Sequence, residues 1–184
     1  MTTEYAYEIK IPLDRVAVLI GKKGEIKKLL EEETKTKIDI DSKEGDVTIK
    51  GEDAINLLTA REIVQAIARG FNPEIAKQLL KQDYILEFVN AQDFAGKSKA
   101  TLDRLKGRVI GKEGKSRRLI EDLTDTNISV YGKTIAIIGL PENTANAKRA
   151  IELLLQGSMH SAVYHMLERR RAQLRQDTFE GERL

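Results

Sequence analysis

The sequence predicts an α+β protein made of two copies of one small βααββα domain, followed by a C-terminal helix. Two observations carry this prediction: a sequence repeat at an offset of 90 residues, and the same order of strand-like and helix-like apolar patterns in each copy. Each copy should form a three-stranded antiparallel sheet with its helices on one face. The 184 residues are 41% hydrophobic and 33% charged, enough to build a buried core.

The repeat is strongest in the middle of each copy. Residues 18–40 align without gaps to residues 108–130, and nine of the 23 pairs are identical. In the first copy the identical residues are Ile20, Gly21, Lys22, Gly24, Leu29, Glu31, Thr34, Thr36 and Ile38. The similarity continues from residues 46–51 to residues 134–139, which indicates a duplicated domain rather than a chance match.

The first copy can be assigned element by element. TEYAYEIKI alternates polar and apolar residues like a strand, and Pro12 ends it. Apolar spacing then predicts two helices, over 13–20 and from about 25 to 35. KIDI and VTIKG, joined by the turn SKEGD, predict a hairpin over 37–50, and a longer helix should follow over 53–69.

The second copy repeats this order after a short connecting helix over 73–81. Asn72-Pro73 suits the start of that helix, because Asn caps helices and Pro fits their first position. The expected elements are a strand over 84–89, helices over 99–109 and 115–124, strands over 127–131 and 134–139, a helix from Pro141, and a tail helix over 158–175. The predicted divisions are a first domain over 1–72, a connecting helix over 73–83, a second domain over 84–157, and a C-terminal helix and tail over 158–184.

Composition excludes several functional classes. The chain has no cysteine and only two histidines, His160 and His165, which leaves little material for disulfides, metal sites or nucleophilic catalysis. No apolar run approaches the roughly 20 residues of a membrane span. We therefore expect a soluble, cytoplasmic, non-enzymatic protein without cofactor or metal. The net charge is only +2, but residues 1–72 hold 12 basic and 14 acidic residues whereas residues 84–157 hold 12 and 9, so an anionic partner is favoured for the second copy.

A Gly-x-x-Gly turn lies between the first two helices of each copy, at residues 21–24 and 111–114. Two glycines this close allow a sharp turn and let another backbone approach without a Cβ in the way. The turn also presents the N-terminus of the next helix, whose free N–H groups attract phosphate. Because the turn occurs twice, each time as Ile-Gly-Lys-x-Gly, it indicates a clamp for a sugar–phosphate backbone.

With these turns, both copies resemble type I KH domains, whose motif is an isoleucine followed by Gly-x-x-Gly within a βααββα fold. The resemblance covers roughly residues 5–157 and implies binding of single-stranded RNA, with about four nucleotides in a narrow apolar groove. An aromatic content of 5% without Trp agrees with this, because other single-strand binders depend on aromatic stacking platforms.

The tandem arrangement, with IGKEGKSRRLIE in the second copy and an Arg-rich C-terminal helix, resembles an archaeal family related to the eukaryotic "partner of Nob" ribosome-assembly factor. That resemblance implies binding near the 3′ end of small-subunit ribosomal RNA, cooperation with the Nob-type endonuclease, and contact with the α subunit of translation initiation factor two. Eukaryotic relatives are described as having lost the first glycine turn, whereas residues 21–24 are intact here.

The second copy is the predicted main RNA site. Six basic residues lie between Lys106 and Arg118, against the single acid Glu113, whereas acids follow the first turn. Asp39 would repel phosphate at the edge of the first groove, where the second copy has Ser129. The predicted RNA-binding residues are Arg108, Ile110, Gly111, Lys112, Glu113, Gly114, Lys115, Arg117, Arg118 and Ile128, with a secondary site at Ile20, Gly21, Lys22, Lys23, Gly24 and Ile38. Val109 and Val130 fit a groove or a core equally well.

Other interpretations are weaker. Gly114-Lys115-Ser116 is like the end of a nucleotide-binding P-loop, but that loop needs a glycine where Val109 stands. The acids Asp39, Asp41 and Asp46 fit strand and turn positions better than a metal-dependent nuclease site. The run ERRRAQLR could bind RNA or a partner, or simply face solvent. Two alternatives stay open: a KH subunit of another RNA machine, such as an exosome cap, and a protein-interaction scaffold that does not bind RNA.

Overall fold

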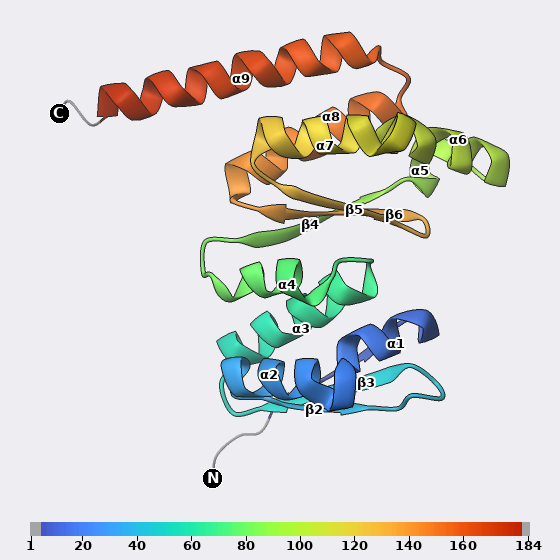
Figure 1. The fold of residues 1–184 in the computed structure, drawn as a ribbon, viewed down its shortest axis with the longest axis vertical. Coiled ribbons are helices and arrows are strands. Elements are labelled where there is room, and N and C mark those ends of the chain that lie inside the picture. The colour runs from blue at the N-terminus through green and yellow to red at the C-terminus, as the bar shows by residue number, and fades with distance from the viewer. Residues whose placement is uncertain (1–4, 182–184) are drawn as a thin grey trace. The chain divides into compact units, whose positions relative to one another are not determined.

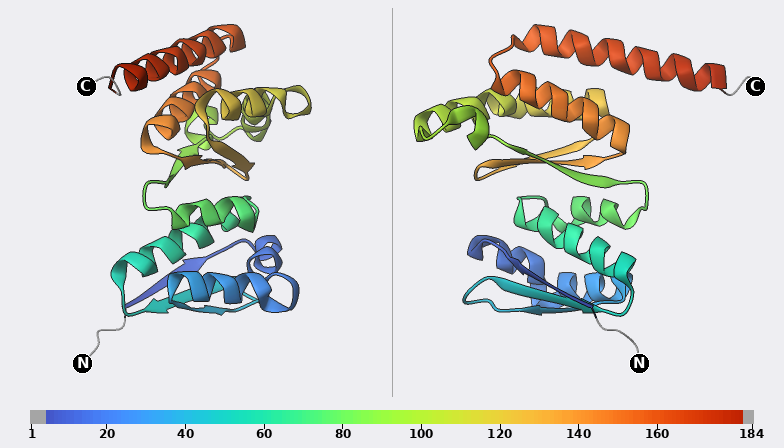
Figure 2. Two further views of the ribbon diagram at one scale, coloured as in Figure 1. Left: turned by 60° about the vertical axis from the view of Figure 1, so that its left-hand side comes forward. Right: turned by 180° about the vertical axis from the view of Figure 1, so that it is seen from behind.

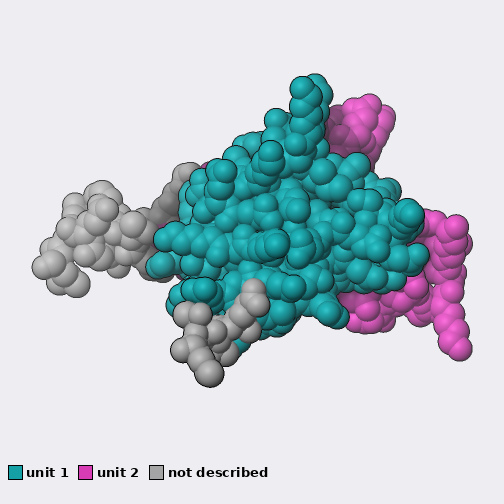
Figure 3. All heavy atoms as spheres, turned by 90° about the horizontal axis from the view of Figure 1, so that it is seen from below, with its two compact units in different colours: residues 1–86 teal, residues 87–184 magenta. Residues whose placement is uncertain are grey.

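The computed structural model describes residues 5–181 and divides the chain into two compact units, residues 1–86 and 87–184 (Figure 3). Each unit has one three-stranded sheet with its helices on one face (Figures 1 and 2). The predicted fold class, two βααββα domains and a C-terminal helix, is confirmed. Residues 182–184 of the predicted tail lie outside the described residues.

The first unit follows the predicted order. Its elements are β1 (Tyr5–Lys10), α1 (Leu13–Ile20), the 3-10 helix η1 (Lys22–Gly24), α2 (Glu25–Thr34), β2 (Lys37–Ile40), β3 (Asp46–Gly51), α3 (Ala54–Ala68), α4 (Pro73–Ala76) and the 3-10 helix η2 (Lys77–Leu80). The central strand β3 pairs antiparallel with both β1 and β2. Buried apolar residues from the strands and from α1, α2 and α3 form the core between sheet and helices.

The connecting segment after Asn72 packs on α3 and belongs to the first unit. The Asn72 side chain accepts a hydrogen bond from the Ile75 amide at 2.9 Å, and Pro73 occupies the first helical position, as the sequence predicts. One helix was expected over 73–81, but the second half tightens into the 3-10 helix η2. Short helical segments commonly tighten in this way at their ends.

The second unit repeats the arrangement with two additions. Its elements are β4 (Ile85–Asn90), α5 (Gln92–Ala95), α6 (Lys99–Ile110), the 3-10 helix η3 (Lys112–Gly114), α7 (Lys115–Thr124), β5 (Asn127–Tyr131), β6 (Thr134–Gly139), α8 (Pro141–Leu155) and α9 (His160–Gly181). The strand order is β4-β6-β5, with β6 central. The additions are the short helix α5 and the much greater length of α9, which follows α8 as α4 follows α3. Val163 and Leu167 of α9 belong to the hydrophobic core of this unit.

Helix α5 was not expected from the sequence. Local polar contacts build it, because Asn90 Nδ2 donates to Asp93 Oδ1 at 2.7 Å and Asn90 Oδ1 accepts from the Gln92 backbone amide at 3.2 Å. A helix of four residues is too short to show an apolar period, so a reading based on periodicity misses it.

Several identical residues of the repeat join the second helix of each copy to the following strand. In the first copy, Thr34 Oγ1 donates to the Leu30 carbonyl and lies 2.7 Å from Thr36 Oγ1. Glu31 Oε1 accepts a hydrogen bond from the Ile38 amide at 2.8 Å. These contacts satisfy polar groups where the chain turns from helix to strand.

The second copy makes the same contacts at the equivalent positions. Thr124 Oγ1 donates to the Ile120 carbonyl and lies 2.8 Å from Thr126 Oγ1, and Glu121 Oε1 accepts from the Ile128 amide at 2.7 Å. The shared threonines and glutamates therefore preserve the fold. Only the shared glycine turn remains as a candidate binding feature of the repeat.

Candidate nucleic-acid interface

The second Gly-x-x-Gly turn joins α6 to α7 through two glycines in left-handed conformations. Gly111 has φ 73° and Gly114 has φ 75°, values that favour glycine. Between them, Glu113 also has positive φ, at 54°, and the Gly114 amide donates to the Gly111 carbonyl at 3.2 Å. The chain reverses within four residues and starts α7 at Lys115.

The two glycines serve different purposes. A Cβ on Gly111 would lie 2.6 Å from the Ser116 Cβ and 2.7 Å from the Ser116 amide nitrogen, so this glycine allows the turn to pack on α7. A Cβ on Gly114 would meet nothing within 4 Å, so this glycine faces open space. Gly114 thus leaves a bare stretch of backbone at the N-terminus of α7, where an anion can approach.

The cations beside this turn differ in their contacts. Lys112 and Lys115 are exposed. Arg118 donates from Nη2 to the Glu113 carbonyl at 2.6 Å and so braces the turn, while Arg117 Nε lies 3.9 Å from Glu121 Oε2. All four were predicted to bind RNA, and the structure brings them to one end of α7.

Arg108 has a structural role that the sequence did not reveal. Its Nε donates to the Leu154 carbonyl at 3.0 Å and its Nη2 donates to the Ser158 carbonyl at 2.5 Å, at the C-terminal end of α8. Its own carbonyl is 2.8 Å from His160 Nε2. Arg108 therefore joins α6 to the end of α8 through its side chain and to the start of α9 through its carbonyl. Contact of Arg108 with RNA stays a prediction.

The predicted groove residues differ in exposure. Ile110 is 36% exposed beside the turn, where an apolar base could contact it. Ile128 is only 3% exposed and belongs to the core, as does the fully buried Val109. Burial thus makes Ile128 and Val109 core residues rather than an exposed surface for a base. Val130 packs partly buried against the same core.

The first turn has nearly the same backbone. Gly21 has φ 73°, Lys23 has φ 52° and Gly24 has φ 79°, and the Gly24 amide donates to the Gly21 carbonyl at 3.3 Å. A Cβ on Gly21 would lie 2.4 Å from Ile26 Cγ1, whereas one on Gly24 would meet nothing within 4 Å.

The predicted secondary site is only partly on the surface. Lys22 and Lys23 are exposed, and Ile20 is part-buried next to them. Ile38 is fully buried in the core of the first unit, like its counterpart Ile128 in the second.

Comparisons with known proteins agree with this geometry. The family described as "KH domain" matches residues 6–66, and that described as "Eukaryotic type KH-domain (KH-domain type I)" matches residues 85–172. A KH domain-containing protein of Methanocaldococcus jannaschii is 52% identical over 176 residues, which cover 94% of this chain and 77% of that protein. The RNA-binding protein pno1 of Dictyostelium discoideum is 30% identical over 169 residues, covering 89% of this chain and 71% of that protein.

The chain belongs to the PNO1-type family of tandem KH-domain proteins. A similar solved structure is that of the a/eIF2alpha-aDim2p-rRNA complex from Pyrococcus horikoshii. The matching chain of that complex is 48% identical to this chain, with a TM-score of 0.87, and the match covers 92% of this chain and 96% of that chain. The resemblance inferred from the two glycine turns is thereby confirmed.

The two KH domains differ in charge beside their turns. Arg104 and Lys115 of the second domain occupy the positions of Asp14 and Glu25 in the first, so both charges are reversed. All four side chains are exposed. Phosphate is thus attracted at these positions in the second KH domain and repelled in the first.

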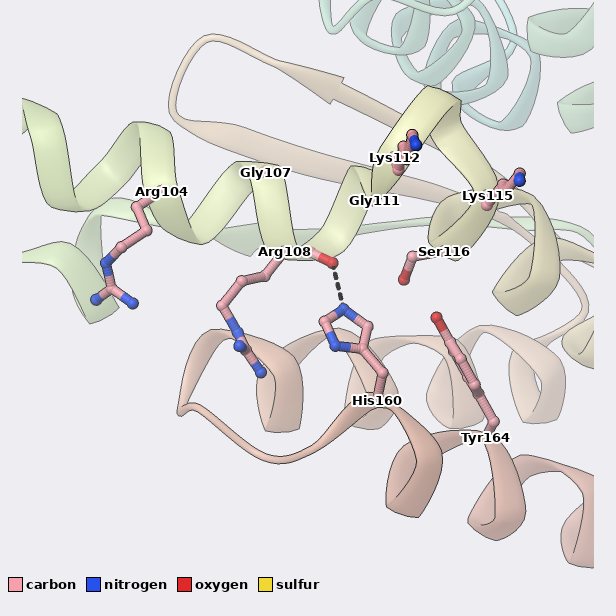
Figure 4. Close-up of a pocket in the computed structure, with 9 residues that line it drawn as sticks. All are labelled: Arg104, Gly107, Arg108, Gly111, Lys112, Lys115, Ser116, His160 and Tyr164. Atoms are coloured by element: carbon pink, nitrogen blue, oxygen red, sulfur yellow. Dashed lines mark hydrogen bonds between the residues drawn. The ribbon is translucent and has the colours of Figure 1, made fainter.

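A hollow of about 430 Å³ lies in the second KH domain between α6, the start of α7 and α9 (Figure 4). Its lining includes the side chains of Arg104, Lys112, Lys115, Ser116, His160 and Tyr164. Sequence reasoning did not assign Arg104, Ser116, His160 or Tyr164 to a site. The repeat gives no signal for the last two, because the aligned segments of the second copy, residues 108–130 and 134–139, end before α9.

The residues considered for other chemistry have local partners. Asp41 Oδ1 accepts from the amides of Lys43 and Glu44, which fixes the hairpin turn, and Asp46 lies 3.6 Å from Lys10 Nζ. His165 Nδ1 lies 3.2 Å from Glu168 Oε2. Among residues 5–181, no group of three His, Cys, Asp or Glu side chains is placed to hold a metal ion. Within that range, too, no helix is long and apolar enough to cross a membrane.

Proposed function

We propose that this protein binds single-stranded RNA without cleaving it, chiefly through its second KH domain, and that its target is the 3′ end of small-subunit ribosomal RNA during maturation. One observation carries the RNA site. The open Gly114 backbone at the N-terminus of α7 lies next to exposed Lys112 and Lys115. Backbone amides and ammonium groups together suit the phosphates of a nucleic acid strand.

The ribosomal target is supported by similarity. The Pyrococcus horikoshii relative was solved as a complex that contains rRNA, at 48% identity and with nearly the whole of both chains aligned. The finer assignment to 3′-end maturation rests on the family resemblance. So does cooperation with the Nob-type endonuclease, which stays a prediction.

The same relative supports a protein partner. Its complex also contains a/eIF2alpha, and we propose that this chain likewise binds the α subunit of translation initiation factor two. Mixing the two purified proteins and measuring their association by calorimetry checks this. Absence of binding, with and without RNA, would contradict it.

The structure decides which variants test RNA binding. Aspartate at Gly111 or Gly21 would collide with α7 or α2, so loss of binding could reflect misfolding. Lys112→Asp/Glu113→Asp and Lys22→Asp/Lys23→Asp instead change charge in the two turns and keep all four glycines. Asp also tolerates the positive φ at residues 113 and 23.

The assay measures binding of a short RNA with the small-subunit 3′ sequence, and of a scrambled one, at fixed salt. We expect the second-turn variant to bind at least about tenfold more weakly and the first-turn variant to change less, because like charges facing phosphates are strongly unfavourable. The first-turn variant removes more positive charge, so a general electrostatic effect would give the opposite order. Equal binding by all three proteins would favour the scaffold alternative. Equal affinity for the two RNAs would contradict the ribosomal target and favour another RNA machine.

A further inference from the structure

The hollow between α6, α7 and α9, which we call the α9 pocket, lies beside the glycine turn of the second KH domain. Its lining includes Arg104, Lys112 and Lys115, and no carboxylate among the described residues lines it. A concave surface with cations on one side concentrates anions. The pocket therefore has the charge of a phosphate site.

A buried hydroxyl inside this pocket lacks a partner. Ser116 is 4% exposed, and its Oγ has no hydrogen-bond partner among the described residues. Figure 4 shows the side chains of Ser116 and Tyr164 pointing toward one another from α7 and α9. A buried polar group without a partner costs free energy, and a ligand that supplies an acceptor removes that cost.

Helix α9 is held in place to complete the pocket. His160 Nε2 lies 2.8 Å from the Arg108 carbonyl, which fixes the first turn of α9 against α6. Val163 and Leu167 anchor the same helix in the core. Tyr164 is thus presented to the pocket by a firmly packed helix rather than by a loose tail.

The first KH domain has different chemistry at the equivalent positions. Ile26 stands where Ser116 stands, so the hydroxyl is replaced by an apolar side chain. Asp14 and Glu25 replace Arg104 and Lys115. The polar, cationic pocket is therefore a feature of the second domain and not a general consequence of the repeated fold.

We propose that the α9 pocket binds one phosphate of the RNA strand beyond those held by the glycine turn, so that the C-terminal helix extends the RNA site. Arg104 and Lys115 supply charge, and the hydroxyls of Ser116 and Tyr164 donate hydrogen bonds to the phosphate oxygens. This inference rests on the proposed RNA binding by the second KH domain.

The test combines protein variants with RNAs in which one phosphate at a time is replaced by a neutral methylphosphonate. In the wild type, we expect that neutralising one phosphate outside the nucleotides held by the glycine turn weakens binding about tenfold. A loss of this size corresponds to one charge-assisted hydrogen bond. Arg104→Gln should weaken binding of the unmodified RNA by a similar factor and become insensitive to that linkage. If no linkage loses its effect in Arg104→Gln, the proposal is wrong.

Two further variants remove only hydroxyls. Ser116→Ala should weaken binding severalfold without lowering the unfolding midpoint, because the buried Ser116 hydroxyl makes no hydrogen bond with the described residues. Tyr164→Phe should weaken binding by a similar factor. Arg149→Gln is the matched control, since Arg149 is an exposed arginine of α8 outside the pocket. Two results together would refute the pocket but not the proposed function: Lys112→Asp/Glu113→Asp loses RNA binding, and Arg104→Gln binds RNA as well as the control Arg149→Gln. Full binding by the turn variant would refute the proposed function itself.

A titration with inorganic phosphate tests whether the α9 pocket binds a phosphate of the RNA or free phosphate. We expect the Ser116 amide resonance to respond to the RNA at far lower concentration than to inorganic phosphate, because the strand is already held at the turn. An equal response to both would overturn the assignment to RNA and indicate a site for free phosphate.

Discussion

The two KH domains have the same turn geometry but opposite charges beside it. Gly21 and Gly111 share a φ of 73°, and the hydrogen bonds that join helix to strand are repeated almost atom for atom. At two neighbouring positions, however, Asp14 and Glu25 are replaced by Arg104 and Lys115. Identities such as Glu31 and Glu121 thus preserve the fold and the turn, whereas the charge differences beside the turn show where the two copies differ toward phosphate.

The largest expected effect comes from exchanging these charges. Arg104→Asp/Lys115→Glu gives the second domain the charges of the first and should weaken RNA binding roughly 1,000-fold, because two attractions to phosphate become repulsions. Titration of a labelled single-stranded RNA at fixed salt measures it. The reciprocal variant Asp14→Arg/Glu25→Lys serves as the control and should bind at least as well as the wild type. A greater loss of RNA affinity in the reciprocal variant would mean that the first KH domain, and not the second, is the main RNA site.

The next effect separates the two glycines of one turn. Gly111→Ala should lower the free energy of unfolding by about 3 kcal/mol, since its Cβ would meet the backbone of Ser116 in a left-handed conformation. Gly114→Ala has open space and should cost about 1 kcal/mol, from backbone conformation alone. Denaturant unfolding compares them, and Gly21→Ala against Gly24→Ala should give the same order. Equal costs within a turn would contradict the packing role of its first glycine.

The sequence predicted the fold well because the repeat and the apolar periods are long-range patterns. It also identified both turns, because the Gly-x-x-Gly spacing lies within four consecutive residues and can be recognised without the fold. It did not reveal how deeply Ile128 is buried, because alternation in a strand marks an apolar face but not whether that face lines a groove or a core. Nor did it reveal the structural role of Arg108, because the carbonyls that its side chain contacts lie 46 and 50 residues away in the sequence. The hollow beside α9 could not be predicted for the same reason, because only folding brings Tyr164 of α9 and Ser116 of α7 to the same hollow.

A smaller, matched effect tests the shared scaffold. Glu31→Ala and Glu121→Ala each remove a hydrogen bond to a strand amide, at Ile38 and Ile128, and should each cost about 1.5 kcal/mol. Hydrogen exchange should show the faster opening confined to the unit that carries the change. Markedly unequal losses in the free energy of unfolding would mean that this hydrogen bond does not stabilise the two domains equally.

The smallest effect concerns a contact at which the domains differ. Lys148 donates to Glu87 at 2.9 Å in the second domain, whereas Arg61 stacks on Tyr7 at 5.1 Å in the first. The hydrogen bond to Glu87 raises the pKa of Lys148 above its ordinary 10.5, so the stability it adds is complete below pH 10.5 and falls as the pH rises through the raised value. Lys148→Met should lack this alkaline component in urea unfolding, whereas Lys97→Met, at an exposed lysine, should keep it. Identical profiles for both variants would disprove the link.

The most direct test of the account is to record the amide resonances of the four turn glycines while single-stranded RNA with the small-subunit 3′ sequence is added. The account predicts that Gly111 and Gly114 respond at the lowest RNA concentrations, with Gly21 and Gly24 responding later or not at all. A first response from Gly21 and Gly24 would contradict the central claim that the second KH domain holds the RNA.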